Sequence, residues 1–273
     1  MNSSTLLNDR KIMNNSDLPP ITNYPAWLWR VIRKIFVELV FAIGSLALGL
    51  IVFPLLRVFN HNKISYRRAA HKAVSYALDF YIHLMSLVRI STYTISDLKA
   101  MRDLRGCVIV ANHPSMLDVI YILAFVRDAV CIVKAGLKKS LVSLIVNALY
   151  ITNNIDFDIM QKECAEALQS GSNLIIFPEG TRTPRHGTNQ YKKGAARIAI
   201  AAGANVQPLH IGGNLKYGLG KGETMLLVNP QERYKYDFTV LPQIQVSNYA
   251  GLSESIAAKR LTDDMRTAID SVK

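Results

Sequence analysis

The sequence predicts an α/β fold with a mixed sheet flanked by helices, preceded by an N-terminal membrane-associated helical segment. From Arg89 onward, apolar runs of strand length alternate with helix-like segments, as is typical of sheets with helices on their faces. Ahead of this region, the run Ile35–Leu56 has the length and composition of a membrane helix. We therefore divide the chain into a disordered tail over residues 1–24, membrane-anchoring helices over 25–90 and an α/β domain over 91–273.

The N-terminal part of the chain contrasts a polar tail with a long apolar run. Residues 1–24 lack any apolar period, which favours disorder, and the apolar run begins too late for a secretory signal peptide. The run Ile35–Leu56 carries only Glu38 as a charge. The stretch Trp27–Lys34, with its tryptophans and basic residues, suits the headgroup level and favours the cytoplasmic side. A half-inserted helix and burial in a soluble core are the alternatives to a spanning helix.

The chain carries 32 Lys and Arg against 20 Asp and Glu, a formal net charge of +12, while 50% of its residues are hydrophobic. A basic, apolar chain predicts an anionic partner surface. Aromatic residues are not interleaved with Lys and Arg in an RNA-binding pattern, and no zinc finger or P-loop occurs. We therefore expect membrane lipids rather than nucleic acid as the partner. The 3 cysteines lie far apart and predict buried thiols rather than a disulfide framework or a metal site.

The remaining elements are predicted from periodicity and length. Ser65–Val88 is amphipathic, which predicts a helix either at the membrane interface or packed on the domain. Strands are expected at Cys107–Ala111, Ala129–Lys134, Tyr150–Asn153, Asn173–Phe177, Val206–Ile211, Thr224–Val228 and Phe238–Val246. Helices are expected at Met116–Val126, Leu141–Leu149, Asp158–Gln169, Gly194–Ala202 and Ser253–Val272.

Polar residues follow the first buried strand of the domain, in the stretch Asn112-His-Pro-Ser-Met-Leu-Asp118. Pro114 ends the strand, so we expect His113 at its carboxyl end and Asp118 in the first turn of the next helix. Across such a corner the carboxylate can reach the imidazole, fix its tautomer and leave the other ring nitrogen free to accept a proton. We predict that His113 is a general base oriented by Asp118. The alternative is a structural corner in which Asp118 stabilises a helix N-terminus.

A second strand ends in a similar corner, Phe177-Pro-Glu-Gly-Thr-Arg182. Gly180 allows backbone amides to approach a ligand, where they could stabilise an oxyanion, and Arg182 can hold a phosphate with two hydrogen bonds. Lys192 and Lys193 add positive charge before a helix N-terminus, which is itself an anion site. The alternatives are an ordinary salt bridge between Arg182 and Glu179 and a solvated helix end. We predict that this region binds substrate through Glu179, Gly180, Thr181, Arg182 and Lys193.

These motifs resemble those of the glycerolipid acyltransferases, the lysophosphatidic acid acyltransferase family. Residues 112–118 resemble the family's Asn-His-x4-Asp block, and residues 177–182 resemble its third block at a similar spacing. Residues 206–211 resemble the fourth block and residues 191–195 the segment after the third, so the resemblance covers about residues 65–250. It implies direct transfer of an acyl group from a thioester of acyl carrier protein or coenzyme A to a lipid hydroxyl, with no cofactor.

One departure from the family pattern concerns the acceptor. The family's second block places an arginine where it helps to hold the acceptor's phosphate, but this chain has Asn153 and Asn154 where Asp-Arg is expected. The resemblance implies a membrane enzyme that acylates a lysophospholipid such as 1-acylglycerol-3-phosphate at the cytoplasmic face, on the inner membrane in a bacterium. The departure keeps a non-phosphate lipid or glycolipid acceptor open. A lipid ester or thioester hydrolase and a non-catalytic membrane scaffold are the alternatives from other classes.

Overall fold

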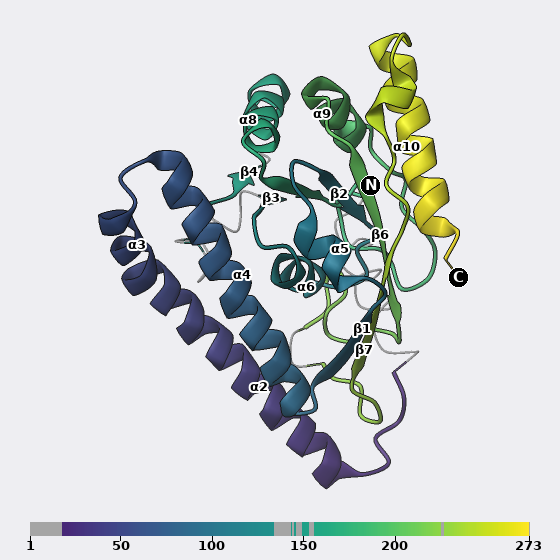
Figure 1. The fold of residues 1–273 in the computed structure, drawn as a ribbon. Coiled ribbons are helices and arrows are strands. Elements are labelled where there is room, and N and C mark those ends of the chain that lie inside the picture. The colour runs from purple at the N-terminus through teal and green to yellow at the C-terminus, as the bar shows by residue number, and fades with distance from the viewer. Residues whose placement is uncertain are drawn as a thin grey trace, which may run out of the picture.

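The computed structural model describes residues 18–133, 143, 145, 149–152, 156–224 and 227–272. Within these residues the chain forms a seven-stranded mixed sheet with helices on both faces and a long helical hairpin at one side (Figure 1). This architecture confirms the predicted α/β class. The strands are β1 (Ser91–Ile95), β2 (Val108–Ala111), β3 (Ala129–Val133), β4 (Ile151–Thr152), β5 (Asn173–Ile176), β6 (Val206–Gly213) and β7 (Tyr234–Val240). The helices of the domain are α5 (Leu98–Asp103), α6 (Asp118–Phe125), α8 (Phe157–Gln169), α9 (Gly194–Ala202) and α10 (Glu254–Asp270), with a 3-10 turn at Val246–Tyr249.

The order of strands in the sheet brings the two polar corners together. The order is β1-β7-β6-β2-β5-β3-β4. Strands β6, β2, β5, β3 and β4 run parallel, whereas β7 is antiparallel to β6 and parallel to β1. Parallel strands place their carboxyl ends at one edge of the sheet, where α/β proteins form their sites. Because β2 and β5 are direct neighbours, the corners that follow them lie side by side.

Two apolar layers hold the helices on the sheet, and β2 contributes to both. Successive side chains of a strand point to opposite faces. Ile109 and Ala111 pack in the layer under α6 and the helical hairpin, whereas Val108 and Val110 pack in the layer under α8, α9 and α10. A strand covered on both faces has no polar side, which explains why the strands of the sheet appear in the sequence as continuous apolar runs.

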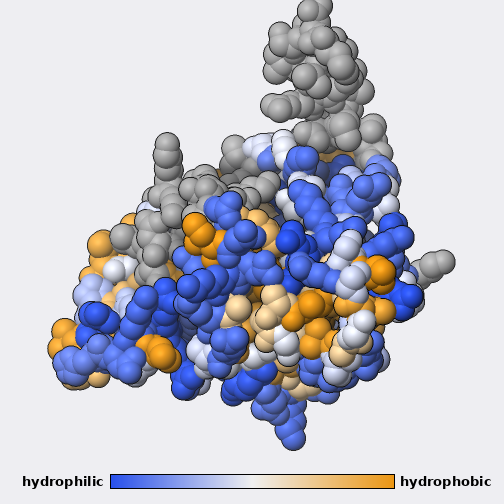
Figure 2. Space-filling view, turned by 90° about the horizontal axis from the view of Figure 1, so that it is seen from above, coloured by the Kyte–Doolittle hydropathy of each residue, from blue (hydrophilic) through white to orange (hydrophobic). Residues whose placement is uncertain are grey.

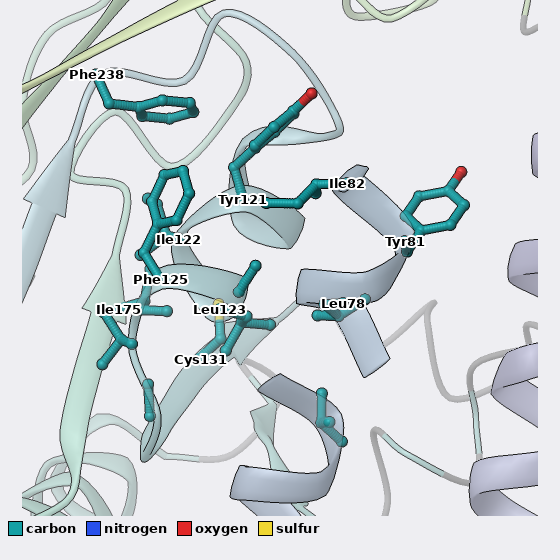
Figure 3. Packing of buried hydrophobic residues seen from close by; sticks show 14 of the residues in the cluster. Leu78, Tyr81, Ile82, Tyr121, Ile122, Leu123, Phe125, Cys131, Ile175 and Phe238 are labelled. Carbon is teal, nitrogen blue, oxygen red and sulfur yellow. The ribbon is translucent and has the colours of Figure 1, made fainter. Parts of the chain in front are cut away.

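Aromatic rings dominate the layer on the side of the hairpin. Tyr121 and Phe125 on α6 contact Phe238 on β7, with ring centroids 5.3 and 5.0 Å apart. Figure 3 shows these rings beside Tyr81 and Ile82 of the helix that precedes the domain. Burial of such large rings contributes much of the free energy that fixes α6 on the sheet. The position of α6 matters because Asp118 is its first residue.

The N-terminal segment is a helical hairpin. Its first arm consists of α2 (Tyr24–Ala47), a π-helical turn η1 (Leu48–Val52) and α3 (Phe53–Phe59), and its second arm is α4 (Lys63–Leu87). The π-helical turn comes just before Pro54, whose missing N–H and bulky ring a regular α-helix cannot accommodate. The two arms lie side by side in Figure 1, with α4 nearer to the sheet. The first arm, Tyr24–Phe59, extends beyond the predicted apolar run Ile35–Leu56 at both ends.

The first arm exposes its apolar side chains. Among the described residues, the helix from Tyr24 to Phe59 is the one long and apolar enough to cross a membrane, and only 11% of its most apolar window is buried. That low burial contradicts the alternative of a soluble core helix. The outward side chains are Leu28, Trp29, Ile32, Ile35, Phe36, Leu39, Ile43, Leu46, Leu50, Ile51, Leu55, Val58 and Phe59. Viewed from above, the molecule shows mostly hydrophilic residues interrupted by hydrophobic patches, one of them at its left edge (Figure 2).

The second arm packs on the domain along one side. Val74, Ile82 and Met85 of α4 are buried in the apolar layer where α4 packs on α6 and β1, in agreement with the alternative of a helix packed on the domain. Tyr76 and Phe80 of the same helix remain exposed, at 59% and 67%. The helix α4 therefore connects the exposed apolar arm to the domain.

Several predicted elements differ from the structure. The apolar-run criterion misses β1, whose sequence Ser-Thr-Tyr-Thr-Ile mixes polar and apolar residues at the sheet edge. The strand expected at Phe238–Val246 begins four residues earlier, as β7, because Tyr234 and Tyr236 point inward between exposed lysine and aspartate residues. No strand occurs at Thr224, Leu227 or Val228. The tail over residues 1–17 and most of the predicted helix Leu141–Leu149 lie outside the described residues.

Candidate active site

The first corner holds an imidazole and a carboxylate in contact. His113 Nδ1 lies 2.9 Å from Asp118 Oδ2. Asp118 is completely buried, whereas the His113 side chain is 19% exposed. Asp118 is held at the first position of α6, and His113 follows β2, so the strand and the helix fix the two groups separately. With Nδ1 engaged, Nε2 is the ring nitrogen left to face a substrate.

The Asp118 carboxylate is satisfied by donors of its own corner. Ser115 N donates to Oδ2 at 2.8 Å, and Ser115 Oγ donates to Oδ1 at 2.5 Å. Together with His113 this gives the buried carboxylate three donors, which offset the cost of removing its charge from water. The carboxylate therefore has a fixed orientation before any substrate arrives. Ser115 therefore serves as a donor to Asp118, and its Oγ also accepts a hydrogen bond from Leu117 N at 3.3 Å.

The second corner contacts the backbone of the first. Glu179 Oε1 accepts hydrogen bonds from His113 N at 3.1 Å and from Thr183 Oγ1 at 2.6 Å. Its other oxygen accepts from Asn189 Nδ2 at 2.7 Å. Thr183 N also donates to His113 O at 2.7 Å, and Thr183 Oγ1 accepts a second hydrogen bond from His113 N at 3.0 Å. Glu179 is only 4% exposed. The sequence predicts that it binds substrate, but in the structure its carboxylate acts as a clamp that holds the His113 backbone through hydrogen bonds.

The Arg182 side chain does not contact Glu179 and instead reaches a neighbouring loop. Its Nη1 donates to the carbonyl oxygens of Leu219 and Gly220 at 2.9 and 2.6 Å. The same Leu219 carbonyl accepts from Met116 N at 3.1 Å, so this loop contacts both corners. Glu223 Oε2 in turn accepts from the Gly220 amide at 3.1 Å. The alternative of a salt bridge between Arg182 and Glu179 is therefore wrong, and Arg182 is held by backbone carbonyls beside the cavity described below.

Gly180 adopts a left-handed conformation, with φ of 67°. Its amide donates to Phe177 O at 2.9 Å and is therefore occupied, so the role of the neighbouring backbone amides as oxyanion donors stays a prediction. A Cβ at this position would lie 2.9 Å from Lys192 Nζ. Lys192 lies over Gly180 and lines the cavity, whereas Lys193 caps α9 and does not line it. Lys192 is thus the lysine at the cavity, whereas the sequence predicts that Lys193 binds the substrate.

A cavity of about 1300 Å³ lies in front of His113. The imidazole stacks on the Phe177 ring, with centroids 4.0 Å apart and planes inclined by 18°. Most of the cavity wall is apolar and comes from α2, α4, β3 and α9, including Val37, Phe41, Tyr81, Met85, Ile132, Val133 and Ile198. The polar residues that line the cavity include Thr181, Arg182, Lys192 and Lys221, together with Lys34 and Glu38 of α2. A large apolar volume with a few convergent cations suits a ligand that has a fatty chain and an anionic head.

Sequence reasoning missed the residues that link the corners. Thr183 and Asn189 lie just beyond the third block, and both bind Glu179. Their polar side chains carry no motif, so only a structure could single them out. The two asparagines that replace the expected Asp-Arg, Asn153 and Asn154, lie outside the described residues.

Comparisons with known proteins agree with this geometry. The family model described as Acyltransferase matches residues 92–212, from β1 to β6. A 1-acyl-sn-glycerol-3-phosphate acyltransferase from Helicobacter pylori is 32% identical over 197 residues, which cover 68% of this chain and 74% of the relative. A chloroplastic 1-acyl-sn-glycerol-3-phosphate acyltransferase from Brassica napus is 26% identical over 77% of this chain, and the chain spans 63% of that relative's length. The crystal structure of the 1-acyl-sn-glycerophosphate acyltransferase PlsC from Thermotoga maritima superposes with a TM-score of 0.64 at 22% identity, covering 89% of this chain and 99% of that one.

The fold and the site together define an acyltransferase, with a His–Asp pair at the carboxyl edge of a mixed sheet. The likeness to the Thermotoga maritima structure shows the fold. The Helicobacter pylori relative and the family model show the ancestry. The chain belongs to the glycerolipid acyltransferase family, whose motifs the two corners carry.

Proposed function

We propose that the protein is a membrane-bound O-acyltransferase that moves a fatty acyl group from a thioester to the hydroxyl of a lysophospholipid such as 1-acyl-sn-glycerol 3-phosphate. The observation that carries the proposal is the His113–Asp118 pair at the wall of the large apolar cavity. The relatives bear the name of this activity. The proposed acyl donor is a thioester of either acyl carrier protein or coenzyme A, because both present the same reactive group.

The proposed chemistry is a direct attack assisted by a general base. The acceptor hydroxyl attacks the thioester carbonyl while His113 Nε2 takes the hydroxyl proton. Asp118 bonded to Nδ1 stabilises the imidazolium and holds its orientation. The tetrahedral intermediate then collapses, the C–S bond breaks, and the leaving thiolate recovers the proton from His113. The products are an ester and a free thiol.

The cations near His113 support a phosphate-bearing acceptor. Arg182, Lys192 and Lys221 line the cavity close to the two corners. Arg182 is fixed by the Leu219 and Gly220 carbonyls, and its remaining guanidinium donors suit a phosphate better than a neutral sugar. These cations could supply the charge that the family's second block provides elsewhere. A non-phosphate lipid acceptor is the second candidate, which the absence of the family's arginine at Asn153 and Asn154 keeps open.

The test is an acceptor panel. Purified protein in lipid vesicles receives a labelled acyl thioester with 1-acylglycerol-3-phosphate, a monoacylglycerol, a lyso-glycolipid or water alone, and mass spectrometry identifies the product. We expect phosphatidic acid from the first and little free fatty acid from water. Preferential acylation of a neutral lipid would favour the second candidate, and rapid release of free acid would make the protein a hydrolase. His113→Ala should lower transfer about 1000-fold, while the matched control His83→Ala, an exposed histidine on α4, should leave it unchanged.

The membrane proposal is supported by the exposed apolar arm. The arm is about 54 Å long at 1.5 Å per residue, and it contributes Val37, Phe41 and Ala42 to the cavity. A fatty chain could therefore pass from the lipid layer into the cavity beside α2. The surplus of basic residues in the N-terminal hundred residues supports contact with anionic lipid on the cytoplasmic side.

A vesicle flotation assay tests the membrane proposal. The double substitution Leu50→Glu and Ile51→Glu charges two side chains of the arm that are 64% and 65% exposed. Because the two glutamates no longer insert in the lipid, the variant should bind anionic phospholipid vesicles more weakly, on the order of a hundredfold. The control, Ile159→Glu and Ile256→Glu, charges apolar residues exposed on α8 and α10. Equal flotation of both variants and the wild type would contradict insertion through this arm.

A further inference from the structure

A tyrosine of β7 extends the His113–Asp118 pair into the protein. Tyr236 is fully buried, and its hydroxyl lies 2.8 Å from Ser115 Oγ. Ser115 Oγ already donates its single proton to Asp118 Oδ1 at 2.5 Å. Because a hydroxyl has one proton, Ser115 must accept from Tyr236. The hydrogen bonds therefore run in one direction, from the tyrosine through the serine to the carboxylate that orients His113.

A buried cation lies against this relay. Lys216 is 7% exposed, its Nζ lies 4.5 Å from the centroid of the Tyr236 ring, and it donates to Gly212 O at 3.2 Å. Burial lowers the pKa of Lys216 to about 8, while the charges of Asp118 and Asp237 act to raise it. Lys216 packs on the ring of Tyr236, whose hydroxyl bonds Ser115, so its charge lies beside the relay that ends at Asp118. A nearby counter-charge stabilises a fully buried carboxylate.

The sheet positions both groups. The antiparallel pairing of β6 with β7 places Tyr236 opposite Gly213. Gly213 has φ of 98°, and a Cβ there would lie 1.9 Å from Lys235 O and 3.2 Å from Lys216 Nζ. The chain therefore makes a close turn that only glycine permits, and this turn returns Lys216 over the ring. Burial holds the pKa of the Tyr236 phenol well above its ordinary value, so the hydroxyl remains a donor.

We propose that Tyr236 and Lys216 are positioning residues that set the basicity of the His113–Asp118 pair through Ser115. Tyr236 polarises the Ser115 hydroxyl, and Lys216 offsets part of the Asp118 charge. Both effects reduce the share of the carboxylate's charge that stabilises protonated His113. Their removal should make the pair more basic. The inference rests on the proposed role of His113 as general base, and neither residue is expected to touch the substrate.

The test is the pH dependence of kcat/KM for acyl transfer, measured on the vesicle-bound protein. Tyr236→Phe removes one hydroxyl and should move the acidic limb of the profile upward by about half a pH unit. Lys216→Met should move it in the same direction. The matched control is Tyr121→Phe, because Tyr121 is also fully buried and its hydroxyl bonds Ser91 Oγ at 2.8 Å instead of a group of the relay. Its ring packs on that of Tyr236, with centroids 4.5 Å apart, and the variant keeps this ring in place.

The outcomes separate the inference from the function on which it rests. An upward shift in Tyr236→Phe and Lys216→Met, with none in Tyr121→Phe, supports positioning. If Tyr236→Phe only lowers the melting temperature, as Tyr121→Phe is expected to do, and leaves the acidic limb in place, the relay has no catalytic effect and the inference is wrong. If His113→Ala retains full transfer, the general-base assignment itself fails, whatever the tyrosine variants show.

Discussion

Glu179 provides the sharpest test of the site geometry, because its sequence-based and structural roles differ. The substitution Glu179→Ala removes the acceptor of three hydrogen bonds, from His113 N, Thr183 Oγ1 and Asn189 Nδ2. Hydrogen bonds to a charged group contribute about 1.5–3 kcal/mol each, and their losses are not additive. Water can enter the space left by the side chain. We therefore expect the free energy of unfolding to fall by about 3–4 kcal/mol.

Two measurements on this variant distinguish the roles. Differential scanning calorimetry should show a melting temperature lower by about 10 °C, at 2–4 °C per kcal/mol for a chain of this size. Steady-state kinetics should show kcat reduced at least about tenfold, since a shift in the His113 backbone misplaces the base, with little change in the acceptor's KM. The control Glu163→Ala removes an exposed carboxylate on α8 and should change neither quantity. A large rise in acceptor KM with an unchanged melting temperature would refute the clamp and restore Glu179 as a substrate-binding residue.

Three further predictions concern other charged groups. Asp118→Asn should lower kcat by at least about a hundredfold with near-normal substrate binding, because the amide no longer fixes the imidazole tautomer; an unchanged kcat in a rapid-quench assay contradicts this. Arg182→Ala should raise the KM for 1-acylglycerol-3-phosphate about tenfold and leave use of a neutral acceptor unaffected, whereas a purely thermal effect would show that Arg182 only holds its loop. Burial alone would raise the pKa of Asp128, but the hydrogen bond and charge of His71, with Ser172 and Arg68, lower it. A lowered carboxyl pKa adds stability that is present above the unfolded value near 3.9 and is lost as pH falls below it, so melting temperatures of Asp128→Asn should vary less between pH 4 and pH 2 than those of the wild type.

The sequence predicts the centre of the site better than its surroundings. His113 and Asp118 are close in the chain, and the strand-turn-helix pattern between them is local, so their contact follows from spacing and the 2.9 Å distance agrees with it. This contact depends on a short segment whose geometry is fixed by its own residues. The adjacency of the two corners depends instead on the pairing of β2 with β5 in the sheet, which a local pattern does not specify.

The partners that stabilise the site depend on distant residues. Tyr236 reaches Ser115 across 121 positions of sequence, because β7 inserts antiparallel beside β6. Nothing in its own segment indicates that contact. The choice of Lys192 over Lys193 is set by where α9 begins, which periodicity locates only to within a residue or two. The apolar residues near Leu227 predict a strand, but the Leu227 carbonyl accepts from the Lys34 side chain of α2.

The contribution of α2 to the cavity wall has a consequence for kinetics. If one wall of the cavity belongs to a helix that rests in lipid, the acceptor arrives by lateral diffusion in a two-dimensional layer. On the proposed membrane-bound arrangement, the rate should then follow the mole fraction of acceptor among the lipids. Diluting the acceptor with inert phospholipid, at constant bulk concentration, should slow turnover. On that arrangement, the affinity of the protein for its acceptor is a property of the lipid surface and is expressed in mole per cent.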